Sequence, residues 1–270
     1  MLRVSEDLPE PEIAVVEGGE FAVFDIETGP LCDEALRLLC PPPKLPPHPG
    51  EFDPASVKYG NTKDAVKRAE KLADYKSAHE LAVKNFDANC VKAAAECFDK
   101  FKEDAALDAT TGRVVAIGLR FQAATNIIDC DGDKEEDGIH CFWAYVAYCL
   151  RENIPMIGWN SNGFDLPFLV RRSWILGIPI PFGVRQGRYW SPLFIDLMRV
   201  WGFDQPGQFA KLDVVAKALG LEGKVEEVDG VAVSGATFYQ LWRENRAVAE
   251  TYLLQDIALP GILAKKIGVV

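Results

Sequence analysis

The sequence predicts an α/β protein in which strands and helices share one core. Short apolar strand-like runs alternate with amphipathic helical segments, no internal repeat occurs, and no flexible linker divides the chain. At 270 residues the chain is long enough to bury a full core. We therefore expect a single domain over residues 1–270, with a Pro-rich connector and helical insertion over residues 31–110 inside it.

The first strand is predicted at residues 21–27, FAVFDIE, because an apolar run ends there in carboxylates and a Thr-Gly-Pro turn follows. Residues 41–50, PPPKLPPHPG, predict an irregular extended connector, since each proline removes a donor and fixes φ. One or two long amphipathic helices are predicted over residues 62–103. Their lysines could guide a single strand, although a solvated helix face is the commoner meaning of such charge.

The later part of the chain returns to alternating strands and helices. The predicted elements are strands at 113–121 and 125–129, a helix ending near 151, a short strand at PMIGWN, helices at 164–176 and 211–220, a hairpin turning on Asp229-Gly230, and a last helix at 236–266. Pro260 is expected to kink or divide that last helix.

Composition excludes several classes of protein. No run approaches the roughly 20 apolar residues of a membrane-spanning helix, and the polar start resembles no signal peptide, so a cytoplasmic location is expected. The seven cysteines form no CxxC pair, which argues against a disulfide framework and a zinc site. The acidic turn at residues 129–138 fails the calcium-loop template, because Lys134 replaces its glycine and His140 its glutamate.

The net charge of −11 argues against a non-specific nucleic-acid coat, because phosphate binding normally uses clustered Lys and Arg. A site that recruits divalent cations through carboxylates can still attract phosphates through the metal. The sign of the overall charge therefore leaves the question of nucleic acid open.

Three segments carry carboxylates in settings suited to chemistry. Asp25 and Glu27 lie two apart on a strand and should point to the same face, where metal coordination would compensate their burial. Asp165 should lie in the first turn of a helix, where the helix dipole favours an anion with or without a function. Tyr252 and Asp256 should share one face of the last helix. Taken singly, each of these patterns is more often structural than functional.

Together the segments resemble the three exonuclease motifs of the DEDD superfamily, in the subgroup with tyrosine in the third motif. FDIET, NxxxFD and YxxxD occur in the order of that family, over roughly residues 20–30 and 113–266. Thr251 stands where the sister subgroup has a histidine. The stretches 196–198 and 211–224 look most like predicted exonucleases related to the proofreading domain of family-B DNA polymerases, often seen in phage and prophage contexts.

The resemblance implies a ribonuclease-H-like fold with carboxylates gathered at one edge of a mixed sheet, and two divalent ions, Mg²⁺ or Mn²⁺, as cofactors. Asp25, Glu27 and Asp256 would hold the first ion. Asp25 would also bridge to the second ion, which Asp165 would help to hold through water. Tyr252 would orient the attacking water.

The expected substrate contacts are Thr28, Asn160 and Phe164. Asn160 would act by hydrogen bonding and Phe164 by stacking on the terminal nucleotide, and both could equally serve the core.

The implied function is a 3′→5′ exonuclease that releases 5′-mononucleotides from single-stranded nucleic acid, with DNA favoured. Two alternatives remain open: a ribonuclease acting on short RNA, and a catalytically silent module that binds single strands or a replication partner. Only a short tail follows Asp256, so any proofreading is expected in trans, beside a separate replication or recombination protein.

Overall fold

The computed structural model describes residues 21–121, 124–184, 191–205, 207 and 209–270. Contacts divide the chain into two compact units, one containing the residues up to Leu31 together with Ala106–Val270, the other Cys32–Ala105.

The first unit is built on a five-stranded mixed sheet with the strand order β3-β2-β1-β4-β5. The strands are β1 (Ala22–Pro30), β2 (Gly112–Phe121), β3 (Ala124–Asp129), β4 (Met156–Gly158) and β5 (Phe194–Asp196). β1 and β2, and β2 and β3, pair antiparallel, whereas β1 and β4, and β4 and β5, pair parallel. This topology confirms the expected α/β class and the ribonuclease-H-like mixed sheet.

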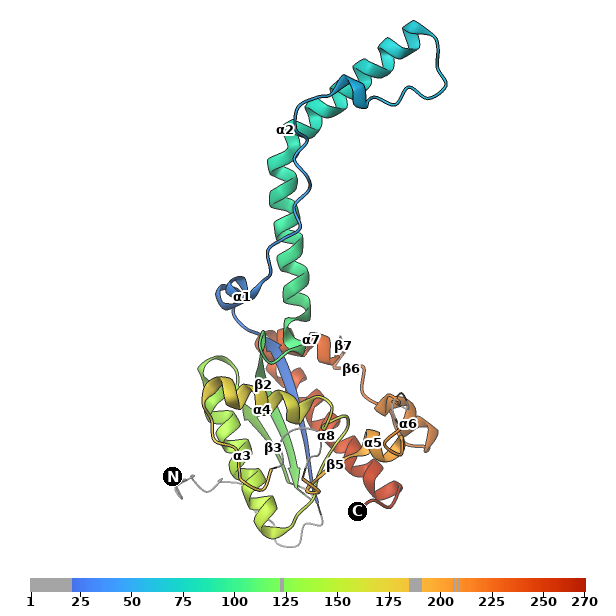
Figure 1. Ribbon diagram of the computed structural model, residues 1–270. Coiled ribbons are helices and arrows are strands. Elements are labelled where there is room, and N and C mark those ends of the chain that lie inside the picture. Colours follow the sequence, from blue (N-terminus) through green and yellow to red (C-terminus); the bar gives the residue numbers. More distant parts are fainter. Residues whose placement is uncertain (1–20, 122–123, 185–190, 206, 208) are drawn as a thin grey trace. The chain divides into compact units, whose positions relative to one another are not determined.

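Helices cover both faces of this sheet (Figure 1). On one face lie α3 (Glu135–Glu152) and α4 (Asp165–Leu176), and on the other lie α7 (Gly235–Glu244) and α8 (Arg246–Lys266). Two short helices, α5 (Leu197–Trp201) and α6 (Leu212–Ala218), and the hairpin of β6 (Glu227–Val228) and β7 (Val231–Ala232) complete the described part of this unit. Asp229 and Gly230 turn the hairpin with φ of 51° and 79°, as the Asp-Gly pair predicts.

A buried ion pair ties α3 and α4 to the sheet. The Arg172 guanidinium donates to both carboxylate oxygens of Glu135, at 2.8 and 2.7 Å, and to the carbonyl of Ala109 at 3.1 Å. Glu135 also accepts the backbone N–H of Val114 at 2.8 Å. Because both charged groups are paired and hydrogen-bonded, their burial in an apolar core is tolerated.

The acidic stretch at residues 129–138 runs from the end of β3 through a 3-10 turn at Gly132–Lys134 into the first turn of α3. Three acids, Glu135, Glu136 and Asp137, occupy the first turn, where the helix dipole favours negative charge.

The last helical segment was expected to kink or divide at Pro260, and this position for the division was wrong. The chain separates into α7 and α8 at Asn245, whose side-chain oxygen accepts the N–H of Val248 and caps α8. α8 continues through Pro260. The asparagine side chain satisfies a free backbone donor in the first turn of α8, and this cap favours the start of a new helix there. Pro260 does not end α8.

The second unit pairs one long helix with the Pro-rich connector. It contains α1 (Asp33–Leu39), α2 (Ala65–Asp104) and a 3-10 turn at Pro54–Ser56, and a further 3-10 turn at Ala105–Leu107 follows α2. Contacts along the connector run in antiparallel order: Asp33 with Lys102, Arg37 with Phe98, His48 with Phe86, Phe52 with His79, and Tyr59 with Arg68. The connector therefore contacts Phe86 of α2 through His48, and α1 contacts Phe98 through Arg37.

The sequence of α2 contains eight Lys or Arg residues and eight Asp or Glu residues. The helix as a whole therefore carries no net charge, and its lysines are interleaved with acids.

All seven cysteines of the chain are free thiols. Among the described residues, no helix has the length and apolar character needed to cross a membrane.

Candidate active site

β1 divides its side chains between the two faces of the sheet. Ala22, Phe24 and Ile26 enter the core shared with α3 and α4, while Val23 packs into the core on the side of α8. Because side chains alternate along a strand, Asp25 and Glu27 share the α8 side. β1 and β2 change register between Glu27 and Thr28, so the regular alternation ends just after the second carboxylate.

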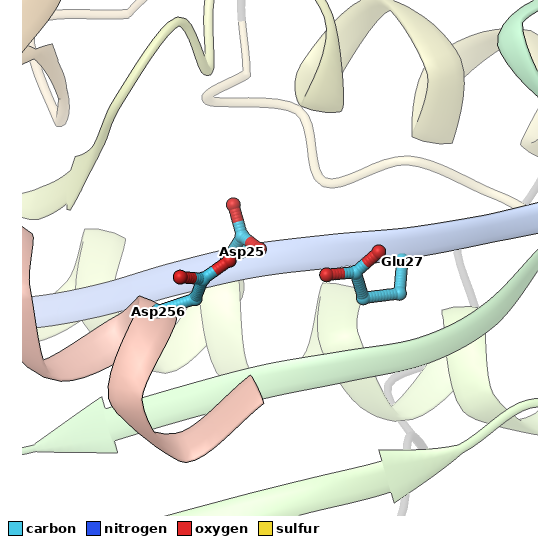
Figure 2. A group of neighbouring side chains, drawn as sticks. All are labelled: Asp25, Glu27 and Asp256. Carbon is cyan, nitrogen blue, oxygen red and sulfur yellow. The ribbon is translucent and has the colours of Figure 1, made fainter. Parts of the chain in front are cut away.

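α8 brings a third carboxylate to this pair. One carboxylate oxygen from each of Asp25, Glu27 and Asp256 lies within 4.8 Å of the others. Figure 2 shows the first two carboxylates on β1 facing the third on α8. Glu27 and Asp256 are buried, with exposed fractions of 7% and 5%.

A glycine allows α8 to approach the sheet this closely. Gly118 on β2 is the register partner of Asp25. A Cβ atom at Gly118 would lie 2.7 Å from Cγ2 of Ile257 and 3.0 Å from Cδ1 of Leu253. A larger residue would therefore push α8, and Asp256 with it, away from β1.

Asp165 contacts the edge of β1 that pairs with β4, opposite the edge that pairs with β2. β4 pairs with β1 only at Ala22 and Val23, so the later N–H groups on this edge lack a strand partner from β4. Oδ1 of Asp165 accepts the N–H of Ile26 at 3.1 Å. Asp165 is not one of the three acids within 4.8 Å, yet its charge lies close enough to raise the pKa of Asp25.

Lys224 belongs to the site, although no pattern in the sequence predicts a role for it. Its Nζ donates to Oδ2 of Asp256 at 2.8 Å and lies 5.9 Å from the ring centroid of Tyr252. Its backbone N–H donates to Asp213 at the start of α6, which positions the loop between α6 and β6. Lys224 lies in the stretch 211–224 that resembles the predicted exonucleases. The sequence pattern of that stretch does not indicate that the ammonium lies beside Asp256.

The electrostatics of the cluster favour bound cations. Burial raises the pKa of Asp25 and of Glu27 well above the usual range, and repulsion from neighbouring carboxylates raises both further. Burial lowers the pKa of Lys224, but attraction to Asp256 and Asp25 outweighs it and leaves that pKa raised. The single ammonium of Lys224 therefore interacts with four carboxylates, those of Asp25, Glu27, Asp165 and Asp256. An all-oxygen donor set of this kind fits Mg²⁺ or Mn²⁺.

Tyr252 lies one helical turn before Asp256 and is 5% exposed. Burial raises the pKa of its hydroxyl, and the charges of Asp256 and Glu27 raise it further. The phenol therefore stays protonated and can orient a water molecule by hydrogen bonding, but it is poorly suited to act as a base.

The three residues expected to contact substrate each make a contact within the protein. The Thr28 hydroxyl donates to the carbonyl of Ala106 at 2.7 Å. Asn160 has a left-handed backbone, with φ of 58°, and its N–H donates to Asp196 at 2.9 Å. Phe164 is half-buried, with its ring centroid 5.6 Å from that of Phe168.

The raised pKa of Asp165 predicts how stability depends on pH. Burial raises this pKa from 3.8 to about 7. Between these two pH values the folded protein keeps a proton on Asp165 that the unfolded chain releases. In EDTA, the stability contributed by protonated Asp165 should be present below about pH 4 and lost as the pH rises through 7. Urea unfolding at pH 5 and pH 8 should show a decrease for the wild type and a smaller one for Asp165→Asn. Equal decreases would contradict this assignment.

Comparisons with known proteins point to one family. The family described as "Predicted 3'-5' exonuclease related to the exonuclease domain of PolB" matches residues 107–253, slightly more than half of the chain. A solved family B DNA polymerase from the hyperthermophilic archaeon Pyrobaculum calidifontis is similar at 24% identity and a TM-score of 0.49. That match covers 61% of this chain and 23% of the polymerase chain. No curated protein matches.

Proposed function

Because the chain belongs to the family of predicted 3′–5′ exonucleases related to the exonuclease domain of PolB, we propose that it shortens single-stranded nucleic acid from the 3′ end. The substrate we favour is DNA, and the products are 5′-mononucleotides. The observation that carries this proposal is the cluster of Asp25, Glu27 and Asp256, in which one carboxylate oxygen from each residue lies within 4.8 Å of the others.

The donor set supports a site for two divalent ions, Mg²⁺ or Mn²⁺. Asp25, Glu27 and Asp256 would hold one ion, and Asp25 would be shared with a second ion that Asp165 supports through water. Such an ion pair supplies charge stabilisation to both the entering and the leaving oxygen of an in-line displacement at phosphorus.

The remaining residues of the site position groups around the scissile phosphate. The Tyr252 hydroxyl would orient the attacking water, since it remains protonated beside Glu27 and Asp256. Lys224 would hold Asp256 in place through its 2.8 Å bond and add a positive charge near the reacting phosphate.

The proposal is tested with 5′-labelled single-stranded DNA and RNA of matched sequence, incubated with Mg²⁺ or Mn²⁺ and with EDTA. We expect products that shorten one nucleotide at a time from the 3′ end, with release of 5′-mononucleotides and no reaction in EDTA. Cleavage within the strand, or intact strands in every metal condition, would contradict it. Faster hydrolysis of the RNA would show that RNA, and not DNA, is the preferred substrate.

Tyr252→Phe is expected to lower kcat by about 10–10³-fold and to leave metal affinity unchanged, because it removes a water-orienting hydroxyl and no ligand. Hydrolysis rates and Mn²⁺ titration by calorimetry measure the two quantities separately. Tyr239→Phe is the matched control, since that hydroxyl accepts a bond from Arg243 on α7. A loss of Mn²⁺ binding without a loss of kcat would show that Tyr252 has a structural role.

A further inference from the structure

An open cavity lies beside the proposed active site, on the side of β5 and α5. Its volume is about 600 Å³, within the range of ligand sites, and none of Asp25, Glu27, Tyr252 and Asp256 lines it. Asn162 and Asp196 do line it. The Asp196 carboxylate accepts the N–H groups of Asn160 and Asn162, at 2.9 and 3.1 Å, and so joins β5 to the loop that leads into Asp165. This loop therefore links the cavity wall to Asp165 of the proposed active site, and the charge of Asp196 is near enough to raise the pKa of Asp165.

The cavity contains a cationic side chain suited to a phosphate. Arg199 is partly exposed, and none of the ion pairs formed among the described residues includes its guanidinium. The acid on the preceding strand, Asp196, already accepts backbone N–H groups from Asn160, Asn162 and Met198, and a further backbone bond from Arg199 itself. Asp204, the other acid of the cavity wall, is exposed to solvent. A planar guanidinium in this position can receive two phosphate oxygens.

The cavity also has an exposed aromatic ring held on a constrained turn. Phe203 is 85% exposed and, like Asp204 after it, has a left-handed backbone, with φ of 50° and 55°. Three backbone bonds hold this turn, from Phe203 to Val200, from Asp204 to Arg199, and from Gln205 to Gly202. Left-handed non-glycine residues are unfavourable, and they persist where the surrounding structure requires them, often at ligand sites.

We propose that this cavity binds an internal nucleotide of the single strand, with its base stacked on Phe203 and its phosphate on Arg199. This inference rests on the proposed function, because it places the bound nucleotide upstream of the 3′ terminus that is hydrolysed. Exposed aromatic rings interleaved with cations are the usual means by which proteins hold single strands without reading sequence. The cavity would add affinity for longer strands to a protein whose net charge opposes nucleic acid.

The first test measures the binding of fluorescein-labelled dT12 by anisotropy, at several salt concentrations, in full-length Asp25→Ala protein that does not degrade the probe. Adding Phe203→Ala should raise Kd by at least about fivefold, as expected for the loss of one stacked base. Adding Arg199→Ala should raise Kd and reduce the slope of log Kd against log salt by about 0.7, as expected for the loss of one phosphate contact.

Matched controls are Phe182→Ala and Arg151→Ala, in the same background. Phe182 is fully exposed and adjoins Gly183, which lies against Leu150 near the end of α3, and Arg151 is paired with its neighbour Glu152. Both controls should bind dT12 with unchanged affinity. If the cavity variants bind as the controls do, the inference is wrong.

A second measurement leaves the cavity residues unaltered. 5-Iodouracil placed at successive positions of dT12 should give a photochemical crosslink to Phe203 from an internal position and none from the 3′ terminus. Crosslinks that map only elsewhere would overturn the inference. If the wild type degrades 3′ ends while the cavity variants bind normally, the cavity assignment alone fails. If the wild type neither binds nor degrades single strands, the proposed function fails and the inference fails with it.

Discussion

Asp25→Ala is expected to abolish hydrolysis while leaving the fold intact. The Asp25 carboxylate lies within 4.8 Å of those of Glu27 and Asp256, and we propose that it is the ligand shared by two ions. Its removal should cost several kcal/mol of transition-state stabilisation, so kcat should fall by at least about 10³-fold. The melting temperature in EDTA should be unchanged or higher, because burial and repulsion from Asp165 and Asp256 both disfavour ionised Asp25.

The measurement is single-turnover hydrolysis of a 5′-labelled oligonucleotide, with circular dichroism to confirm the fold. Asp25→Asn provides a second variant that keeps the shape of the side chain, and it should be equally inactive. Glu136→Ala, which removes an exposed acid from the first turn of α3, is the matched control and should retain full activity. Turnover near that of the wild type in either Asp25 variant would remove Asp25 from the mechanism.

Arg172→Met is expected to destabilise the fold by about 3–5 kcal/mol, because it leaves the carboxylate of Glu135 buried without its partner charge. The Ala109 carbonyl also loses a donor. The double variant Arg172→Met/Glu135→Gln should lose less stability than Arg172→Met alone, since no charge then remains buried while the glutamine oxygen can still accept the N–H of Val114.

Urea unfolding of the two variants and the wild type measures these differences. Arg151→Ala is the control, because its pair with Glu152 is exposed and should contribute no more than about 1 kcal/mol. A single Arg172 variant as stable as this control would show that the buried pair contributes little to the fold.

Most elements of the sheet and its helices were predictable because their signals are local. The strand at 113–121 was recognised from its apolar run and is β2, and the Asp229-Gly230 turn was recognised from two residues. Short elements were missed, since α1, β5 and α5 offer too few residues for a periodic pattern. The break at Asn245 was missed because it depends on a cap from a single side chain. Pro260, fifteen residues later, is the stronger signal for a break in the sequence.

The candidate site divides in the same way. The common face of Asp25 and Glu27 follows from the period of a strand, and that of Tyr252 and Asp256 from the period of a helix. Their assignment to one site came from a resemblance, because no local pattern states how far β1 lies from α8. The contact of Lys224 with Asp256 joins residues 32 apart, and the bond from Ile26 to Asp165 joins residues 139 apart.

By itself, the sequence therefore determined which side chains share a face, where the carboxylates stand within their elements, and the class of the fold. These properties depend on backbone periodicity and on neighbours a few residues away. Only the tertiary structure decided which faces meet. Gly118 leaves room for α8 against β1, the short pairing of β4 leaves the Ile26 N–H for Asp165, and the loop after α6 places Lys224 on Asp256. Such contacts depend on the packing of segments far apart in the chain, where steric fit and charge compensation act together.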